Sequence, residues 1–270
     1  MNRRMSLCAV AVLSAASLMA AVKAPKPKTV AERRAEKAAE AAKRMQEDGG
    51  DAIRPGTMKG HLLIANAQKL VDPFEIEEIR DFLWDQLNFR IEIRESKPVN
   101  PTTVVEALRT SGAGCGVFLV EDPSLPILLL APEDHWAIVN CTRLAEGAKT
   151  QKYVDMRVKK ELVRAFSLVC SGGSSTHAGS MFGAIKTASD LDGFPAIEIP
   201  FDILDRFNHY LKPLGVTPAE RMPYVSAVYE SWCPAPTNKW QKLIWDQAHT
   251  PPTKPIKITY DKDKQKPVVK

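Results

Sequence analysis

The sequence has few of the residues on which metal sites and disulfide-stabilised folds depend. It contains five histidines and five cysteines among 270 residues, and no two histidines stand in an HxH or HxxxH pair. A histidine-rich metal site could therefore form only through tertiary contacts. The net charge of +5 is concentrated in the tail from Pro251, which carries six lysines and two aspartates. Because no continuous basic surface remains, nucleic acid is not an expected partner.

The N-terminal segment predicts export. Arg3 and Arg4 precede an uncharged run from Met5 to Val22 that is rich in Ala, Leu, Val and Ser. A basic start followed by a short apolar segment is typical of a secretory signal, and small residues make a poor membrane span. We therefore predict a signal peptide over residues 1–24, with an ambiguous cleavage site, and a periplasmic or secreted protein. The membrane is a partner only if this segment is retained.

Composition divides the remainder into three parts. Residues 25–57 are rich in Ala, Glu, Lys and Arg without an apolar stripe, which predicts a charged spacer. Residues 58–249 have the apolar content of a single folded domain. Residues 250–270 form a basic Lys/Pro tail, which we expect to be solvated.

The order of apolar patterns predicts the fold class. In the first half, segments whose apolar residues have helical spacing alternate with strand-like apolar runs. A central amphipathic helix at residues 157–170 follows, and the patterns after it are helical. This order predicts an α+β fold in which a mixed β-sheet is packed with helices, followed by a mainly helical C-terminal part. The expected strands are 61–65, 89–93, 116–120, 126–131 and 136–140, and the other expected helices are 72–89, 102–109, 201–211, 218–232 and 238–247.

The central helix contains the outline of a peptidase motif. Residues 160–164, KELVR, have the spacing of HExxH, with lysine and arginine in place of both histidines. A strand at residues 138–142 leads into Arg143-Leu144 before this helix, and Met181 follows it in a turn. This arrangement resembles the archaemetzincins, a family of zinc-dependent metallopeptidase-like proteins, over roughly residues 60 to 185. The resemblance implies a metzincin-like central helix, with Ser167 and Cys170 at the two later motif positions.

The departures from the family pattern imply that its chemistry has been lost. The resemblance places Lys160, Arg164 and Cys170 where three histidines would bind zinc, and the family's further cysteine set is absent. Lysine and arginine offer no lone pair at neutral pH and would repel a dication. We therefore expect a non-catalytic pseudo-peptidase with no cofactor, in which Lys160, Arg164 and Arg157 line a basic groove and Glu161 pairs with Arg164.

Such a groove would bind an acidic ligand, a peptide or an envelope protein. The alternative interpretation is that Lys160, Arg164 and Arg157 line no groove and only face solvent on an exposed side of the helix. The alternative function is a metal- or thiol-dependent hydrolase built from Glu161, Cys170 and His177, and zinc is expected only in that case. However, Cys170 lies at the C-terminal end of the helix, where the helix dipole does not favour a thiolate.

The cysteines and a glycine-rich stretch complete the candidate features. Four cysteines follow the signal segment, and an exported protein could pair them in up to two disulfides. The sequence does not choose among the three connectivities; a disulfide from Cys170, with Cys233 as a candidate partner, is one expectation, and buried free thiols are the alternative. The stretch Ser111–Gly116 looks like a phosphate-binding loop, but it precedes a strand instead of following one, so we expect a flexible entry to that strand.

Overall fold

The structure is a computed structural model of the 270-residue chain, and it describes residues 28–173, 180–194, 197–250, 258–261 and 266–269. The predicted signal peptide and His177 lie outside the described residues. The chain divides into two units, residues 1–39 and residues 40–270, and the division falls within helix α1 (Val30–Asp48). Among the described residues, no helix is long and apolar enough to cross a membrane.

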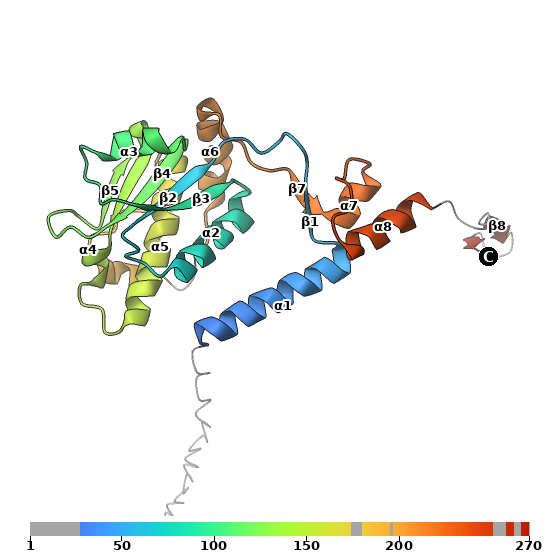
Figure 1. Cartoon of the computed structure of the whole chain (residues 1–270), viewed down its shortest axis with the longest axis horizontal. Coiled ribbons are helices and arrows are strands. Elements are labelled where there is room, and N and C mark those ends of the chain that lie inside the picture. Colours follow the sequence, from blue (N-terminus) through green and yellow to red (C-terminus); the bar gives the residue numbers. More distant parts are fainter. Residues whose placement is uncertain (1–27, 174–179, 195–196, 251–257, 262–265, 270) are drawn as a thin grey trace, which may run out of the picture. The chain divides into compact units, whose positions relative to one another are not determined.

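The second unit contains a five-stranded sheet with the order β3-β2-β4-β6-β5 (Figure 1). Four strands are parallel, and β5 (Leu128–Ala131) runs antiparallel to β6 (Trp136–Asn140). The others are β2 (Leu62–Ala67), β3 (Ile91–Ser96) and β4 (Cys115–Val120). The predicted mixed sheet is confirmed. The strand predicted at 136–140 coincides with β6, and the other four predicted strands are present with shifted ends.

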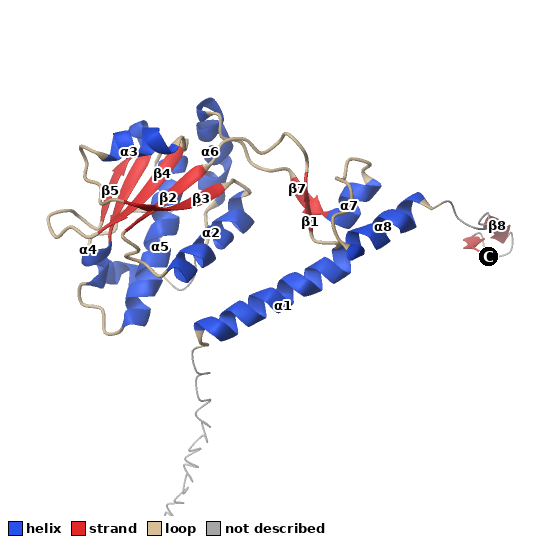
Figure 2. Ribbon diagram, viewed as in Figure 1, coloured by secondary structure: helices blue, strands red, loops and turns tan. Residues whose placement is uncertain are grey.

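Helices cover both faces of this sheet (Figure 2). Alternate residues of β2 show the division, since Leu62 and Ile64 pack with one set of helices and Leu63 and Ala65 with the other. Because strand side chains alternate between faces, a strand covered on both sides must be apolar throughout. The first face carries α2 (Pro73–Leu87), α5 (Gln151–Cys170) and α6 (Phe201–Leu211), and the second carries α3 (Val104–Ser111).

The two edge strands differ in chemistry. On β3, Glu92 accepts hydrogen bonds from Arg90 at 2.7 Å and from Arg94 at 2.6 Å, so that edge is charged. On β5, Leu128, Leu129 and Leu130 are half-buried, and no described strand pairs with the outer side. Charged edges discourage further pairing, whereas an apolar edge does not.

Short elements connect the strands and helices. The polar turn between β5 and β6 is a 3₁₀ helix, η1 (Pro132–Asp134), and β6 leads directly into α4 (Cys141–Ala145). After α5 come two more 3₁₀ helices, η2 (Ala188–Gly193) and η3 (Lys212–Leu214). The segment that contains η2 returns along α5 and contributes to the site described below.

The predicted helix at 218–232 is wrong in its first half. Residues Arg221–Pro223 form strand β7, which pairs with β1 (Asp51–Ile53), and only Tyr224–Tyr229 are helical, as α7. Pro223 disfavours a helical conformation at Met222 and supplies no amide proton for a helix that began earlier. Helix α8 (Lys239–His249) matches its prediction, and a hairpin of β8 (Ile258–Asp261) and β9 (Lys266–Val269) lies in the predicted tail.

Candidate functional site

Four charged side chains of α5 are buried, although they were expected on an open groove or in solvent. Arg157, Lys160 and Arg164 are 2%, 4% and 7% exposed, and Glu161 is 0% exposed. The interpretation in which these charges face solvent is therefore wrong. The reason is that the segment after α5 folds back over this side of the helix and supplies partners to each of them.

Arg157 joins three parts of the chain. Its Nε and Nη2 donate to the carboxylate of Asp192 at 2.8 and 2.7 Å, and its Nη1 donates to the carbonyls of Leu144 and Glu146 at 3.0 and 2.8 Å. These hydrogen bonds hold the pKa of Asp192 below its usual range, because they favour the carboxylate. Arg157 thus fixes η2 and the end of α4 against α5.

Lys160 makes a second attachment to the same segment. Its ammonium donates to the carbonyl oxygens of Leu191 at 2.7 Å and Phe194 at 2.5 Å. Burial lowers the pKa of Lys160, and the nearby Asp192 opposes this effect. The cation therefore serves as an internal hydrogen-bond donor, which closes η2 onto the helix.

Glu161 and Arg164 form a buried ion pair one turn further along. Arg164 Nη1 donates to Glu161 Oε1 at 2.6 Å, and Nη2 donates to the carbonyl of Gly183 at 2.7 Å. Burial raises the pKa of Glu161, and Arg164 opposes this with its charge and hydrogen bond. Glu161 Oε2 and Arg164 Nε are buried without a hydrogen-bond partner among the described residues. The predicted pairing of Glu161 with Arg164 is thus present.

The residues at the motif positions do not fit a zinc ion. An ammonium and a guanidinium that donate to carbonyl oxygens have no lone pair to offer a metal. Met181, expected in a turn, is buried at the start of the segment that covers α5. Within the described ranges, no group of three or more His, Cys, Asp or Glu residues is placed to hold a metal ion.

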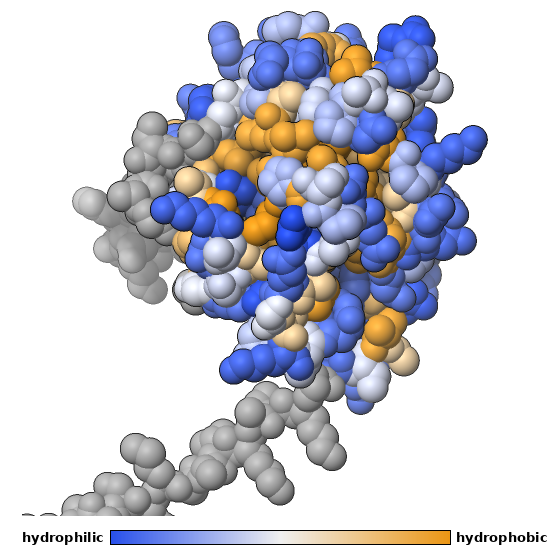
Figure 3. Space-filling model, turned by 90° about the vertical axis from the view of Figure 1, so that its left-hand side faces the viewer, coloured by the Kyte–Doolittle hydropathy of each residue, from blue (hydrophilic) through white to orange (hydrophobic). Residues whose placement is uncertain are grey.

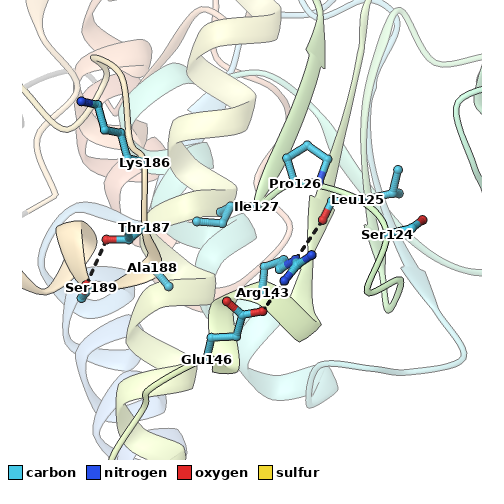
Figure 4. Close-up of a pocket in the computed structure, with 10 residues that line it drawn as sticks. All are labelled: Ser124, Leu125, Pro126, Ile127, Arg143, Glu146, Lys186, Thr187, Ala188 and Ser189. Carbon is cyan, nitrogen blue, oxygen red and sulfur yellow. Dashed lines mark hydrogen bonds and ion pairs between the residues drawn. The ribbon is translucent and has the colours of Figure 1, made fainter.

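Two adjoining pockets run along β5 and are the hollow part of this region. The larger pocket, about 500 Å³, lies between residues 124–127 and 186–189 (Figure 4). Arg143, on α4, and Glu146, just after α4, also line this pocket. The smaller, about 270 Å³, continues along Leu128 and Leu130 to Glu161 and Arg164. Both are lined by Pro126, Ile127 and Lys186, so we describe them together as the β5 groove.

Asn140 and Arg143 hold one wall of the β5 groove, a role that was not predicted for either residue from the sequence. Asn140 Nδ2 donates to the carbonyls of Asp122 and Leu125 at 2.6 and 2.9 Å, and Arg143 Nε donates to Leu125 at 3.2 Å. A signal was available, because an asparagine between a strand and a helix is a typical N-cap. Its side chain does accept from Thr142 N at 3.2 Å.

The edge of β5 presents unpaired backbone groups. Asn140 N donates to Ile127 O at 2.9 Å, and the register pairs Leu129 with Ile138 and Ala131 with Trp136. Because bonded residues alternate in an antiparallel pair, the N–H and C=O of Leu128 and Leu130 point away from β6. Figure 3 views the molecule from the β5 side and shows apolar surface bordered by polar side chains.

The Cys170 thiol lies outside the β5 groove and is not poised as a nucleophile. All four cysteines among the described residues are free, and burial raises the pKa of Cys170 well above its usual range. A neutral thiol without exposure is a poor nucleophile, so the thiol form of the hydrolase alternative has no support here. Cys170 lies beside Cys115 in the main core, whereas Cys233 packs in the separate cluster around Tyr224. The structure thus does not place Cys233 as the partner of Cys170.

Comparisons with known proteins give limited matches. No protein-family model matches the chain, and no curated protein matches it significantly. The crystal structure of archaemetzincin from Methanopyrus kandleri aligns with 58% of this chain and 98% of its own, at 13% identity and a TM-score of 0.46. A zinc-dependent peptidase from Methanocorpusculum labreanum aligns with 49% of this chain and 92% of its own, at 13% identity and a TM-score of 0.38. At this identity and these scores, the matches establish neither family membership nor an activity for this chain.

Proposed function

We propose that this chain is an exported, non-catalytic binding protein that holds an extended peptide in the β5 groove. The observation that carries the proposal is the groove itself, which runs beside the outer edge of β5. At this edge, no strand of the described residues pairs with the outward backbone groups of Leu128 and Leu130. An extended peptide can add to such an edge through main-chain hydrogen bonds, while pockets receive alternate side chains.

The composition of the groove suits a peptide better than a highly charged ligand. Glu161 with Arg164 and Glu146 with Arg143 are ion pairs, at 2.6 Å each, so four of the charges that line it cancel. Lys186 also lines the groove, and among the described carboxylates it acts on that of Asp190, whose pKa is lowered mainly by hydrogen bonds from Thr187 and Lys186 N and to a smaller extent by the Lys186 charge. Ile127, Leu128 and Leu130 supply apolar walls. We therefore expect a mainly apolar peptide with one acidic group near Lys186.

The partners of the helix residues support a non-catalytic role. A glutamate can act as a general base only if it reaches a water at the reacting centre. Glu161 is instead 0% exposed and hydrogen-bonded to Arg164, and Lys160 uses its ammonium to bind two carbonyls of the chain. Both arrangements support the fold of the segment that covers α5, and neither prepares a nucleophile.

Peptide selection followed by a matched pair of variants tests the binding. A mixture of random N-acetylated nonapeptides is passed over the immobilised chain, and retained sequences are resynthesised for fluorescence anisotropy. Leu130→Pro removes an outward N–H that makes no bond to β6, whereas Leu130→Ala removes the side chain and keeps that N–H. We expect Leu130→Pro to weaken binding about tenfold more than Leu130→Ala, which corresponds to one lost hydrogen bond. Equal effects, or no selective retention, would refute edge binding.

Incubation of the retained peptides with the chain tests the non-catalytic part. We expect the peptides to stay intact by mass spectrometry, with or without added zinc. Cleavage that Glu161→Gln abolishes would overturn this part and restore the hydrolase alternative. Export is tested separately, by cell fractionation and by N-terminal sequencing of the mature chain: a cytosolic chain that keeps Met1 would contradict it.

A further inference from the structure

Two glycine-rich stretches that the β5 groove does not use come together in the core. Ser111–Gly116 leads into β4, whose first residue is Cys115, and Cys170 is the last residue of α5 before Ser171-Gly172-Gly173. Helix α5 packs on β4, and both thiols are 0% exposed in the same core cluster. The fold therefore brings the ends of these two elements to one place.

The glycines explain how closely the chain packs around Cys115. A Cβ atom added to Gly114 would lie 2.4 Å from a side-chain carbon of Val216, and one added to Gly116 would lie 2.9 Å from Leu108. Side chains at these positions would therefore collide with the core on both sides of Cys115. Packing accounts for Gly114 and Gly116, and Gly112 is the left-handed C-cap of α3, with a φ of 72°. These reasons replace both the phosphate loop and the flexible entry as the explanation of the stretch.

The two thiols lie at one place, beside Tyr210. A Cβ atom added to Gly172, two residues after Cys170, would lie 2.9 Å from the Tyr210 ring, and that ring packs edge-on against His135 at 5.7 Å. The carbonyl of His135 accepts a hydrogen bond from the amide of Gly116, the residue after Cys115, at 3.0 Å. Burial, with Cys115 nearby, raises the pKa of Cys170, in agreement with this placement. Of the remaining described cysteines, Cys141 lies in the same core cluster but beside a different neighbour, and Cys233 lies in another cluster. Cys141 is buried near Glu121, and Cys233 contacts Tyr224. Position therefore selects one pair out of the connectivities that the sequence alone leaves open.

We propose that Cys115 and Cys170 become joined by a disulfide when the chain folds in an oxidising environment. One thiolate attacks a disulfide of the glutathione or oxidoreductase class, which forms a mixed disulfide and releases one thiol. The second protein thiolate then displaces the other half as a thiol. Two protons and two electrons pass from the protein to the oxidant, and one S–S bond is exchanged for another.

The burial of the pair determines when this step occurs. An oxidant cannot reach thiols that are 0% exposed, so the bond forms during folding, before α5 closes on β4. A chain that has folded reduced keeps both thiols. The product ties the end of the helix that carries Arg157 and Lys160 to the middle strand of the sheet.

Oxidative refolding with peptide mapping tests the proposal. The full chain is unfolded, refolded in a buffer of reduced and oxidised glutathione, and alkylated without reduction. Trypsin leaves Cys115 and Cys141 together on residues 110–143, so a second protease that cuts after Glu121 is needed to separate them. We expect a linked pair of peptides carrying Cys115 and Cys170, two hydrogen masses lighter than their sum. Cys141 and Cys233 should be alkylated.

Three results would overturn the proposal. They are free Cys115 and Cys170 after oxidative refolding, a bond from Cys170 to Cys233, and rapid oxidation of the chain that has already folded reduced. The variant Cys115→Ser should leave Cys170 alkylated, and Cys141→Ser should leave the linked peptide unchanged. If Cys115→Ser fails to fold, the peptide map of the unaltered chain still decides the question.

Discussion

The attachment of η2 to α5 through Arg157 gives the sharpest prediction. In Arg157→Met the aliphatic stem stays, but the Asp192 carboxylate and the carbonyls of Leu144 and Glu146 lose four hydrogen bonds. Removing one partner of a buried ion pair costs about 3–5 kcal/mol. The Asp192 side chain is 28% exposed and can be partly rehydrated, so we take the lower end, about 3 kcal/mol.

Such a loss should be plain in thermal unfolding followed by circular dichroism. For a domain of this size about 3 kcal/mol lowers the midpoint by roughly 6–12 °C. Arg109→Met is the matched control, because Arg109 also makes two hydrogen bonds to one carboxylate, that of Glu106, but is 75% exposed. We expect the control to leave the midpoint unchanged. If Arg157→Met costs no more than the control, the interpretation of Arg157 as a structural attachment is wrong.

The pH dependence of the same pair has a defined sign. Arg157 lowers the pKa of Asp192 in the folded chain below its ordinary value of 3.8. The pair therefore contributes stability above pH 3.8, and this contribution is lost as the pH falls through the folded pKa. The difference in free energy of unfolding between the unaltered chain and Arg157→Met should shrink in acid. A difference that grows there would contradict the assignment.

Three further predictions concern other parts of the core. Burial raises the pKa of Glu161 above 4.5. The unaltered chain should therefore lose stability relative to Glu161→Gln as the pH rises from 4.5 through the pKa of Glu161 in the folded chain, as measured by urea unfolding. A gain in relative stability over this range would contradict the raised pKa. Asn140→Ala should cost about 2 kcal/mol in the same assay, because two carbonyls lose buried donors; an unchanged midpoint would refute its role in the groove wall. The disulfide between Cys115 and Cys170 should stabilise the oxidised chain by about 4 kcal/mol over the reduced one, from the length of the closed loop; equal midpoints would contradict this.

The sequence predicted the sheet and its helices because their signals are local. Apolar periodicity locates β4 and α2, and Asp72 with Pro73 marks the start of α2, where Phe74 N donates to Asp72 at 2.8 Å. The charged side of α5 could not be interpreted in the same way. Its burial depends on the later segment 183–194. Apart from the Asp192 carboxylate, this segment supplies carbonyl oxygens, which leave no trace in side-chain composition. The placement of Cys115 against Cys170 is likewise a property of tertiary packing.

The different chemistry of the two sheet edges has a consequence for self-association. A chain with two receptive edges can stack without limit, as in fibrils, because every added copy leaves a new edge exposed. Here Arg90, Glu92 and Arg94 occupy one edge, and the leucines of β5 occupy the other. Two copies that met through β5 would use both receptive edges at once. Concentrated protein with empty grooves should therefore stop at a closed dimer, and a bound peptide should return it to the monomer.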